Sequence, residues 1–388
     1  MDANLRVPGP TPIPVAVREA QARPMINHRG PEFAELLDAT SRGIARLIGS
    51  DGEVFLLTGS GTSAMEAAVV NTVSAGDRVL VVSIGSFGDR FGTIAAAFGA
   101  SVDILDVEWG LAADPDTLAA HLSASPPYRA VFLTHNETST GVSNPIRELA
   151  ATVRVAAGEP LVVVDGISGL GAMPFQMDAW GVDLVISASQ KAFMASPGIS
   201  IAALGPRATA ASETASAPRY YWDFREARKW ASKGQTPWTP AVSVLYGLQI
   251  GVAALQAEGA EVTWARHAAI AAGAQAGLEA LGLVLVAPPG HRSATVSAAW
   301  LPEGMAWPDL ARWLREHGLV LAGGQGKWTG RILRMGHMGD VAFDEIAAAL
   351  ETLGRGLAHS NHACHPDEAV AAGWEAHRLA ASAERVRT

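Results

Sequence analysis

The sequence predicts an α/β fold in which helices sandwich a mostly parallel sheet, followed by a smaller C-terminal α+β domain. The chain of 388 residues is too long for one core of ordinary size, since domains hold roughly 150 residues. From Glu53 to Ser189, strand-like and helix-like segments alternate. The strand-like segments are continuous apolar runs such as "LVVVD", which are typical of strands buried on both faces of a parallel sheet.

The elements of this alternating region follow in order. Strands are predicted at 53–59, 77–83, 101–107, 129–137, 160–166 and 183–189, and helices at 62–73, 89–100, 114–124 and 145–158. Asp114 before Pro115 is a predicted helix N-cap. In such a sheet, ligands bind beyond the carboxyl ends of the strands, so we expect the functional residues there.

After Ser212 the pattern changes. The stretch 218–240 is rich in aromatic residues without a clean period, and a long helix is predicted from about Ala241 to Gln256. Helical patterns then recur at 264–282, 307–318 and 344–357, with a strand after the first. We therefore predict an N-terminal arm (1–20), a large domain (21–257) and a small domain (258–388). The polar, helical tail after His359 receives no function.

Composition narrows the class of protein. Hydrophobic residues make up 49% and charged residues 17%, as in globular chains. The net charge is −9 and no Lys/Arg-rich run occurs, which argues against nucleic acid or an anionic membrane as partner. Cys364 is the only cysteine, so a reducing compartment is expected. The start lacks a signal-peptide pattern, and the longest apolar stretch is interrupted by Gln275 and Glu279. We expect a soluble, cytoplasmic protein.

The turn "TGSGTSAMEA" (58–67) is a candidate phosphate site. Backbone amides at a helix N-terminus and the hydroxyls of Ser60 and Thr62 would face an anion there. No Gly-Lys-Ser/Thr follows, so the turn is not a Walker A motif. Taken alone, such a turn is more often an ordinary strand-to-helix connection.

Three charged residues accompany that turn. Asp165 ends a buried strand, where an unpaired carboxylate is costly, so it caps locally or holds a proton on a ligand. Lys191 follows the strand in "DLVISASQKAF", where a partly desolvated amine can form a Schiff base. Arg334 lies in an apolar strand and either pairs locally or clamps a substrate carboxylate. Each is ordinary alone; together, a phosphate turn, an acid, a lysine and an arginine are what pyridoxal 5′-phosphate requires.

The motifs "GPTPIP", "TGSGTSAMEA", "SIGSFGDR", "THNETSTGV", "VVDGISGLGAMPFQMDAWGVDLVISASQKAF", "QTPWTPAVSVLYGL" and "RMGHMG" resemble those of one family. The chain is similar to class V, fold-type I aminotransferases of the alanine–glyoxylate and serine–glyoxylate (serine–pyruvate) group. The resemblance covers nearly the whole chain. It implies a pyridoxal-phosphate enzyme that transfers an amino group from a small amino acid, such as alanine or serine, to glyoxylate or pyruvate.

The resemblance also implies roles for individual residues. Lys191 matches the lysine that carries the cofactor, Asp165 the partner of its ring nitrogen, and Arg334 the arginine that binds the substrate carboxylate. Other cofactor-binding positions are matched by Ser60, Gly61, Thr62 and Gln190 at the phosphate, Thr138 near the phenolic oxygen, Phe87 and Ile167 on the two ring faces, and Thr239 from a neighbouring subunit. The last match implies an obligate homodimer with shared sites.

One position departs from the family pattern. Some relatives place a tyrosine on the phosphate where this chain has Thr236, whose shorter hydroxyl has less reach. Trp238 beside it would be a wall of the site or part of a subunit interface. No metal ligand set is expected, although His362, Cys364 and His365 lie close together in the tail.

Several alternatives stay open on the sequence alone. A desulfurase or lyase would need a reactive cysteine on a mobile loop, and the tail position of Cys364 argues against it. Another donor, such as aspartate, ureidoglycine or pyridoxamine, would change the pocket. A side-chain carboxylate would require a second cation, for which Arg29 is a candidate, and Gln325 is a further candidate substrate contact. A non-catalytic binding protein would not need the lysine, acid and arginine together. A nicotinamide-dependent oxidoreductase would want G-x-G-x-x-G, which "TGSGTS" does not complete.

Overall fold

The computed structural model of the protein describes residues 3–385. Its centre is a seven-stranded sheet in which β10 alone runs antiparallel to its two neighbours. The strands, in spatial order, are β2 (Glu53–Gly59), β10 (Gly198–Leu204), β9 (Leu184–Ala188), β8 (Leu161–Asp165), β5 (Ala130–Thr134), β3 (Arg78–Ser83) and β4 (Ser101–Asp106). The predicted mostly parallel sheet is confirmed.

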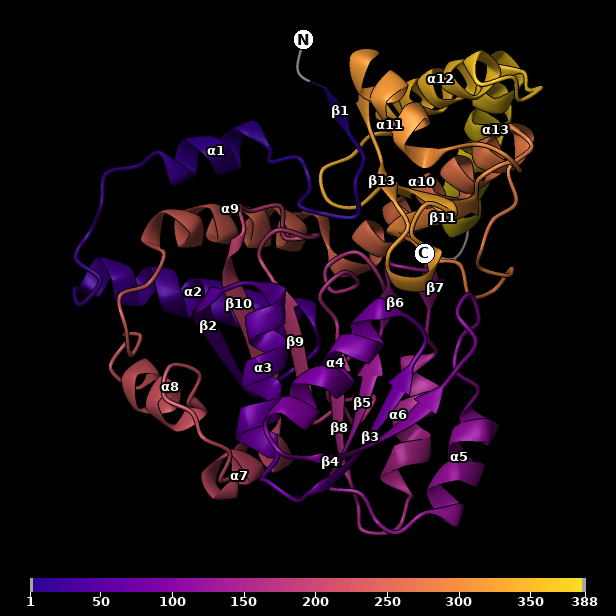
Figure 1. Cartoon of the computed structure of the whole chain (residues 1–388). Coiled ribbons are helices and arrows are strands. Elements are labelled where there is room, and N and C mark those ends of the chain that lie inside the picture. The colour runs from indigo at the N-terminus through magenta and orange to yellow at the C-terminus, as the bar shows by residue number, and fades with distance from the viewer. Residues whose placement is uncertain (1–2, 386–388) are drawn as a thin grey trace.

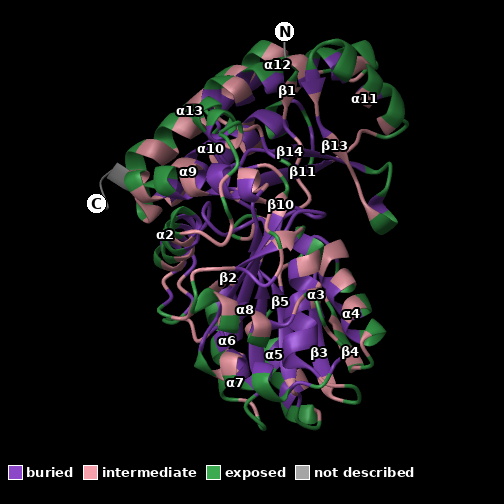
Figure 2. Cartoon of the chain, turned by 90° about the vertical axis from the view of Figure 1, so that its left-hand side faces the viewer, coloured by how far each residue is buried: buried purple, intermediate pink, exposed green. Residues whose placement is uncertain are grey.

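Helices cover both faces of this sheet, as Figures 1 and 2 show. One core contains side chains of α3 (Gly61–Thr72), α4 (Ser86–Ala97), α7 (Pro206–Thr214) and α8 (Phe224–Ala231). The other contains those of α2 (Pro31–Leu47), α5 (Pro115–Ala124), α6 (Ile146–Arg154) and α9 (Val242–Glu258). Alternate residues of a strand enter opposite cores: Val79 and Val81 lie in the first, Leu80 and Val82 in the second. Burial on both faces explains why the strands are continuous apolar runs.

The elements of the alternating region match the predictions in type and order, with differences in extent. The helix predicted at 145–158 is α6, which ends at Arg154. The strand predicted at 129–137 is divided into β5 and β6 (Asn136–Glu137), and β6 pairs with β7 (Val142–Ser143). Helix α4 begins at Ser86, earlier than predicted. Strand β10 was not predicted. The predicted N-cap is confirmed, because the Asp114 carboxylate accepts a hydrogen bond from the Thr117 amide at 2.9 Å.

A second unit follows α9. It consists of α10 (Ala260–Ala280), β11 (Val296–Trp300), α11 (Trp307–Glu316), β12 (Leu319–Val320), β13 (Ala322–Gly323), the 3₁₀ turn η1 (Gly326–Trp328), β14 (Ile332–Gly336), α12 (Phe343–His359) and α13 (Pro366–Arg385). Strands β11, β14 and β13 form a sheet in that order. The tail helix α13 packs closely on α10: a Cβ on Gly273 would lie 2.8 Å from the Gly373 carbonyl oxygen.

The N-terminal segment connects both units. Strand β1 (Asn4–Leu5) pairs with β12 of the second unit, and α1 (Val15–Gln21) packs on α9 (Figure 1). Between α9 and α10, Gly259 has φ 89°, a conformation that favours glycine, and the helix axis is interrupted there. This break lies beside the predicted domain boundary at 257/258, which stays a prediction. Within residues 3–385, the structure has no helix of the length and apolarity needed to span a membrane.

A buried histidine ties α10 to the loop after β14. Nδ1 of His267 lies 2.7 Å from the Thr263 carbonyl oxygen, and Nε2 accepts a hydrogen bond from the Gly339 amide at 3.1 Å. Burial lowers the pKa of His267 to about 4. A proton on Nε2 would place two donors opposite each other, so the folded state requires the neutral ring.

We expect this histidine to make stability fall in acid. Its folded-state pKa is below the unfolded value of about 6.5, so the unfolded chain binds the extra proton as pH falls from about 6.5 to 4. Its contribution then declines by about 1.4 kcal/mol per pH unit. Urea unfolding of the wild type and His267→Gln at several pH values measures it: the stability gap between them should narrow toward pH 4. A gap independent of pH would contradict the assignment.

Candidate active site

The candidate site lies at the carboxyl ends of the parallel strands. Ser60 is the N-cap of α3, and Gly61 and Thr62 form its first turn. This turn meets the loop after β8, because a Cβ on Gly61 would lie 2.8 Å from Cδ1 of Ile167. Ser60 and Thr62 are exposed, so their hydroxyls are open to a ligand. The structure therefore brings Ser60, Gly61, Thr62 and Ile167 together.

Asp165 ends β8 and is buried. Its Oδ1 accepts a hydrogen bond from the Ile167 amide at 2.9 Å. Burial raises its pKa to about 7; the nearby Glu137 adds to this, and the positive charge of Lys191 acts in the opposite direction. No arginine, lysine or histidine of the described residues forms an ion pair with it. This carboxyl group thus lacks the cation that would hold it ionised.

Lys191 lies in the turn after β9 and is partly buried. Its Nζ donates to the Pro8 carbonyl, and a Cβ on Gly9 would lie 2.6 Å from Nζ. Gly9 has φ 115°, a backbone conformation that favours glycine, and it lets the N-terminal segment cross the lysine. Thr11 binds the same turn: its amide donates to the Gln190 carbonyl at 3.2 Å and its hydroxyl to the Lys191 carbonyl at 3.1 Å.

The electrostatics of Lys191 suit a nucleophilic amine. Burial lowers its pKa to about 8; Asp165 opposes this shift, and Arg334 adds to it. Near neutral pH, a larger fraction of the molecules then carries an uncharged amine at this position than an ordinary lysine would, and a nucleophilic amine must be uncharged.

Phe87 opens α4, and a buried carboxylate holds it in place. Glu137 accepts hydrogen bonds from the amides of Phe87 at 2.9 Å and Ser139 at 3.0 Å and from the Ser139 hydroxyl at 2.6 Å. Burial raises the pKa of Glu137. Glu137 lies within the motif "THNETSTGV", but no role was predicted for it; the available signal was a single carboxylate among uncharged residues just after an apolar strand-like run.

Arg334 in β14 is the link between the two units at the site. Its Nε donates to the Gly323 carbonyl at 2.8 Å and its Nη1 to the Thr138 carbonyl at 2.9 Å. No carboxylate of the described residues pairs with it, and burial lowers its pKa to about 10. The local ion pair considered for Arg334 is therefore absent from the part of the chain that the structure describes, and Nη2 has no hydrogen bond there.

Of the buried amide oxygens that lack a hydrogen-bond partner in the described part of the chain, two belong to predicted site residues. They are Oε1 of Gln190, beside Lys191, and Oε1 of Gln325, close to Gly323, to whose carbonyl Arg334 donates. Buried polar groups are nearly always hydrogen-bonded, so each indicates a group that comes from a ligand, a water or a partner.

Thr236 and Thr239 do not reach this constellation within the described chain. Thr236 is buried and its hydroxyl donates to the Trp238 carbonyl at 2.7 Å, whereas Thr239 is exposed. Arg29 holds the same loop, donating to the Thr236 carbonyl at 2.7 Å and stacking on Trp230 at 4.4 Å. Arg29 is thus engaged in a loop contact, and its hydrogen-bond partners are a side-chain amide and two carbonyls instead of a carboxylate.

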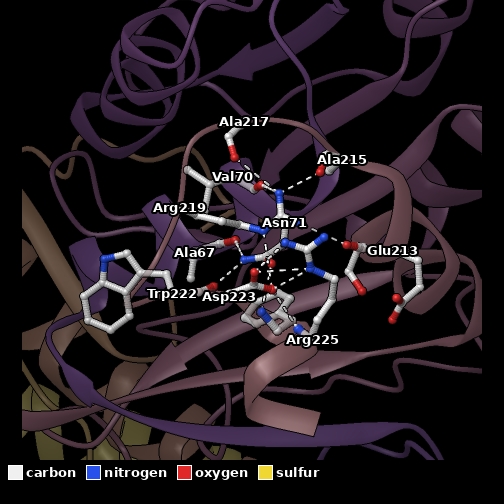
Figure 3. A network of polar contacts seen from close by, with 12 residues as sticks. Ala67, Val70, Asn71, Glu213, Ala215, Ala217, Arg219, Trp222, Asp223 and Arg225 are labelled. Carbon is white, nitrogen blue, oxygen red and sulfur yellow. Dashed lines mark hydrogen bonds and ion pairs between the residues drawn. The ribbon is translucent and has the colours of Figure 1, made fainter. Parts of the chain in front are cut away.

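A network of polar contacts orders the neighbouring segment 212–225 (Figure 3). Arg219 donates to the carbonyls of Val70, Ala215 and Ser212 at 3.0, 2.7 and 3.0 Å, and Asn71 accepts from the Phe224 amide at 2.9 Å. This segment carries Tyr220 and Tyr221, which form the aromatic patch together with Trp238 from the loop after α8. Tyr220 is 76% exposed and stacks on Trp238 at 4.7 Å between ring centroids.

Cys364 lies apart from the site. Its thiol donates to the Gly354 carbonyl at 3.3 Å and packs against the C-terminal core. His362 binds the Leu281 carbonyl at 2.9 Å. Among residues 3–385, no group of three or more His, Cys, Asp or Glu side chains could hold a metal ion.

The family model described as "Aminotransferase class-V" matches residues 17–334. The chain belongs to the class V aminotransferase family. It is an aminotransferase with fold type I, and its cofactor is pyridoxal 5′-phosphate, on which this family depends. The residues fit that group, because the Asp165 carboxyl without a cation lies beside the lysine and the N-terminus of α3 offers exposed Ser60 and Thr62 hydroxyls to an anion.

Individual relatives carry different names. The chain is 38% identical over 354 residues to the "Soluble hydrogenase, small subunit" of Synechococcus sp. (strain PCC 6716), covering 90% of this chain and 92% of that protein. It is 35% identical over 354 residues to a serine–glyoxylate aminotransferase of Hyphomicrobium methylovorum, covering 88% and 86%. The crystal structure of a subgroup IV aspartate aminotransferase from Thermus thermophilus superposes with a TM-score of 0.85 at 32% identity, covering 92% and 99%.

Proposed function

We propose that this aminotransferase moves the amino group of a small amino acid, such as alanine or serine, to a small 2-oxo acid, glyoxylate or pyruvate. The observation that carries the proposal is Arg334, a buried guanidinium without a carboxylate partner among the described residues, fixed by two carbonyls beside the lysine site. Such a fixed fork fits the carboxylate shared by every amino acid and 2-oxo acid. The name of the Hyphomicrobium relative supports the choice of substrates.

The cofactor would be held by residues at the strand ends. Its phosphate would meet Ser60, Gly61, Thr62 and Gln190, its ring would lie between Phe87 and Ile167, and Thr138 would stand near its phenolic oxygen. When bound, pyridoxal phosphate supplies the carbonyl that takes up the amine and a ring that accepts the electrons released at Cα.

The chain's own groups then divide the work. Asp165 holds the proton on the ring nitrogen, since a cation there satisfies its buried carboxyl group. Lys191 carries the cofactor and, once displaced by the substrate amine, moves the proton from Cα as the base. Arg334 orients the substrate so that this proton faces Lys191. The second half-reaction uses the same groups in reverse order.

Arg334→Ala tests the substrate site. We expect kcat/KM for alanine and serine to fall roughly 30-fold or more, as when one partner of a buried charge pair is removed. Cofactor binding should change little, because Arg334 contacts the substrate. The measurement is steady-state kinetics together with a cofactor titration. An unchanged kcat/KM would remove Arg334 from the substrate site.

We also propose a homodimer in which a second copy covers the aromatic patch and supplies Thr236 and Thr239 to the phosphate. The exposed rings of Tyr220 and Tyr221, of which Tyr220 stacks on Trp238, fit an interface. The shorter reach of Thr236 leaves Thr239 as the main contributed hydroxyl. The molar mass in solution decides the dimer: a monomer at working concentration would contradict it.

The alternatives differ in what supports them. A donor with a side-chain carboxylate is supported by the name of the Thermus relative. It is also supported by Lys327, an exposed cation that lines a cavity together with Ser86, the residue before Phe87. A desulfurase or lyase that uses a thiol has no support at the site, because the single cysteine packs into the C-terminal core. Comparing alanine, serine and aspartate as donors, with glyoxylate as acceptor, separates the proposed small neutral donor from a donor with a side-chain carboxylate.

A further inference from the structure

The proposed phosphate site has no cation of its own. The residues assigned to it are Ser60, Gly61, Thr62, Gln190, Thr236 and Thr239, all uncharged, and Lys191 is used to carry the cofactor. The N-terminus of α3 offers a phosphate dianion only a partial positive charge, and arginine is the side chain best shaped to add a full one.

Arg90 is the arginine within reach. It lies one turn after Phe87 on α4, and its Nη1 donates to the Thr62 hydroxyl at 3.3 Å. Its guanidinium packs on the Phe87 ring at 4.6 Å from the centroid. Arg90 therefore touches one residue of the phosphate turn and the ring assigned to the cofactor's face.

The guanidinium of Arg90 also has no counter-ion among the described residues. No carboxylate of the described residues forms an ion pair with it, and the adjacent Asp89 is engaged with the Ser83 hydroxyl at 2.6 Å. Arg90 lines a cavity of about 730 Å³ together with Trp109 and Lys327, so an anion can approach it. A half-buried arginine next to an open phosphate turn and without a counter-ion is poised to bind an anion.

The positive charge of Arg90 acts on Asp165 of the candidate site. Burial raises the pKa of Asp165, and the positive charge of Arg90 works against that rise. The hydrogen bond to Thr62 and the packing on Phe87 are the two contacts that link Arg90 to this site, and the effect of its charge on Asp165 agrees with them.

We propose that Arg90 is a further cofactor-binding residue, which pairs with the phosphate of pyridoxal phosphate and at the same time holds the Phe87 ring. This rests on the proposed arrangement of the cofactor. The phosphate contact and the ring contact make different predictions, because pyridoxal has the same ring and aldehyde without the phosphate.

The experiment compares the dissociation constants of pyridoxal phosphate and pyridoxal, measured by titrating the apoenzyme of the wild type and of Arg90→Met, which keeps an apolar stem near Phe87. We expect the constant for pyridoxal phosphate to rise about tenfold or more, which is about 1.4 kcal/mol. The constant for pyridoxal should change less than about threefold. Arg90→Lys keeps the charge and should recover part of the affinity for pyridoxal phosphate.

Arg331→Met is the matched control, because Arg331 is exposed and packs on the Trp300 ring at 5.3 Å. It should change neither constant, and the thermal midpoints of the apoenzymes verify folding. Equal weakening of both ligands would overturn the phosphate contact and leave Arg90 with the ring alone. An unchanged constant for pyridoxal phosphate would place Arg90 outside the cofactor site. A wild type that binds neither ligand would overturn the proposed cofactor arrangement itself.

Discussion

Lys191→Ala should abolish turnover, with a loss of at least roughly 10⁴-fold in kcat, the upper end for removal of a positioned base. The variant loses both the amine that carries the cofactor and the group that moves the Cα proton. Its absorbance should lack the band of lysine-bound cofactor, and borohydride should no longer fix the cofactor to the peptide that contains residue 191. Activity and the spectrum together measure this.

Lys229→Ala is the control. Lys229 is an exposed lysine paired with Glu226 at 3.1 Å on α8, and its removal should leave activity and spectrum unchanged. Retained catalysis in the Lys191 variant, with or without the band, would remove Lys191 from its assigned role.

Asp165→Asn should separate binding from chemistry. The amide has nearly the shape of the carboxyl group, so the cofactor should still attach to Lys191 and give its band. The neutral side chain no longer keeps the ring nitrogen protonated, and we expect kcat to fall roughly 10²–10³-fold, as for loss of one preorganised electrostatic contact. Single-turnover measurements with alanine should assign the loss to proton removal at Cα.

Asp309→Asn gives the matched control, since Asp309 is an exposed carboxylate paired with Arg312 at 3.1 Å on α11. It should behave as the wild type. If Asp165→Asn also retained near-normal turnover, the buried carboxyl group would serve the structure alone.

Much of the large sheet could be predicted because buried parallel strands leave a local signature, the continuous apolar run. Strand β10 could not, since "GISIAAL" is as compatible with a loop or a short helix as with a strand. Its reversed insertion between β2 and β9 depends on pairing with segments far away in the sequence. Helix α8 was missed for another reason: it buries Phe224 and Ala227 on one face, but a helix of 8 residues does not stand out within the aromatic-rich stretch 218–240. Its local start signal is Asp223, whose carboxylate accepts a hydrogen bond from the Arg225 amide at 2.9 Å.

The site shows the same division. Lys191, Asp165 and the phosphate turn follow strand ends, so a parallel sheet brings them together from sequence position alone. The Pro8 carbonyl at Lys191, the support of Phe87 by Glu137 and the reach of Arg90 to Thr62 arise from packing between distant segments. A residue-by-residue match to motifs does not contain such contacts. The roles assigned to the individual residues stay predictions until the variants are measured.

The central claim is that Lys191 carries a cofactor which takes up the amino group of a small amino acid. The most direct measurement is the absorption spectrum of the purified protein with pyridoxal phosphate, before and after addition of alanine, serine or aspartate one at a time. The account predicts a band from the lysine-bound cofactor that bleaches with alanine or serine and returns when glyoxylate or pyruvate is added. A band that no amino acid bleaches, or no band at all, would contradict it.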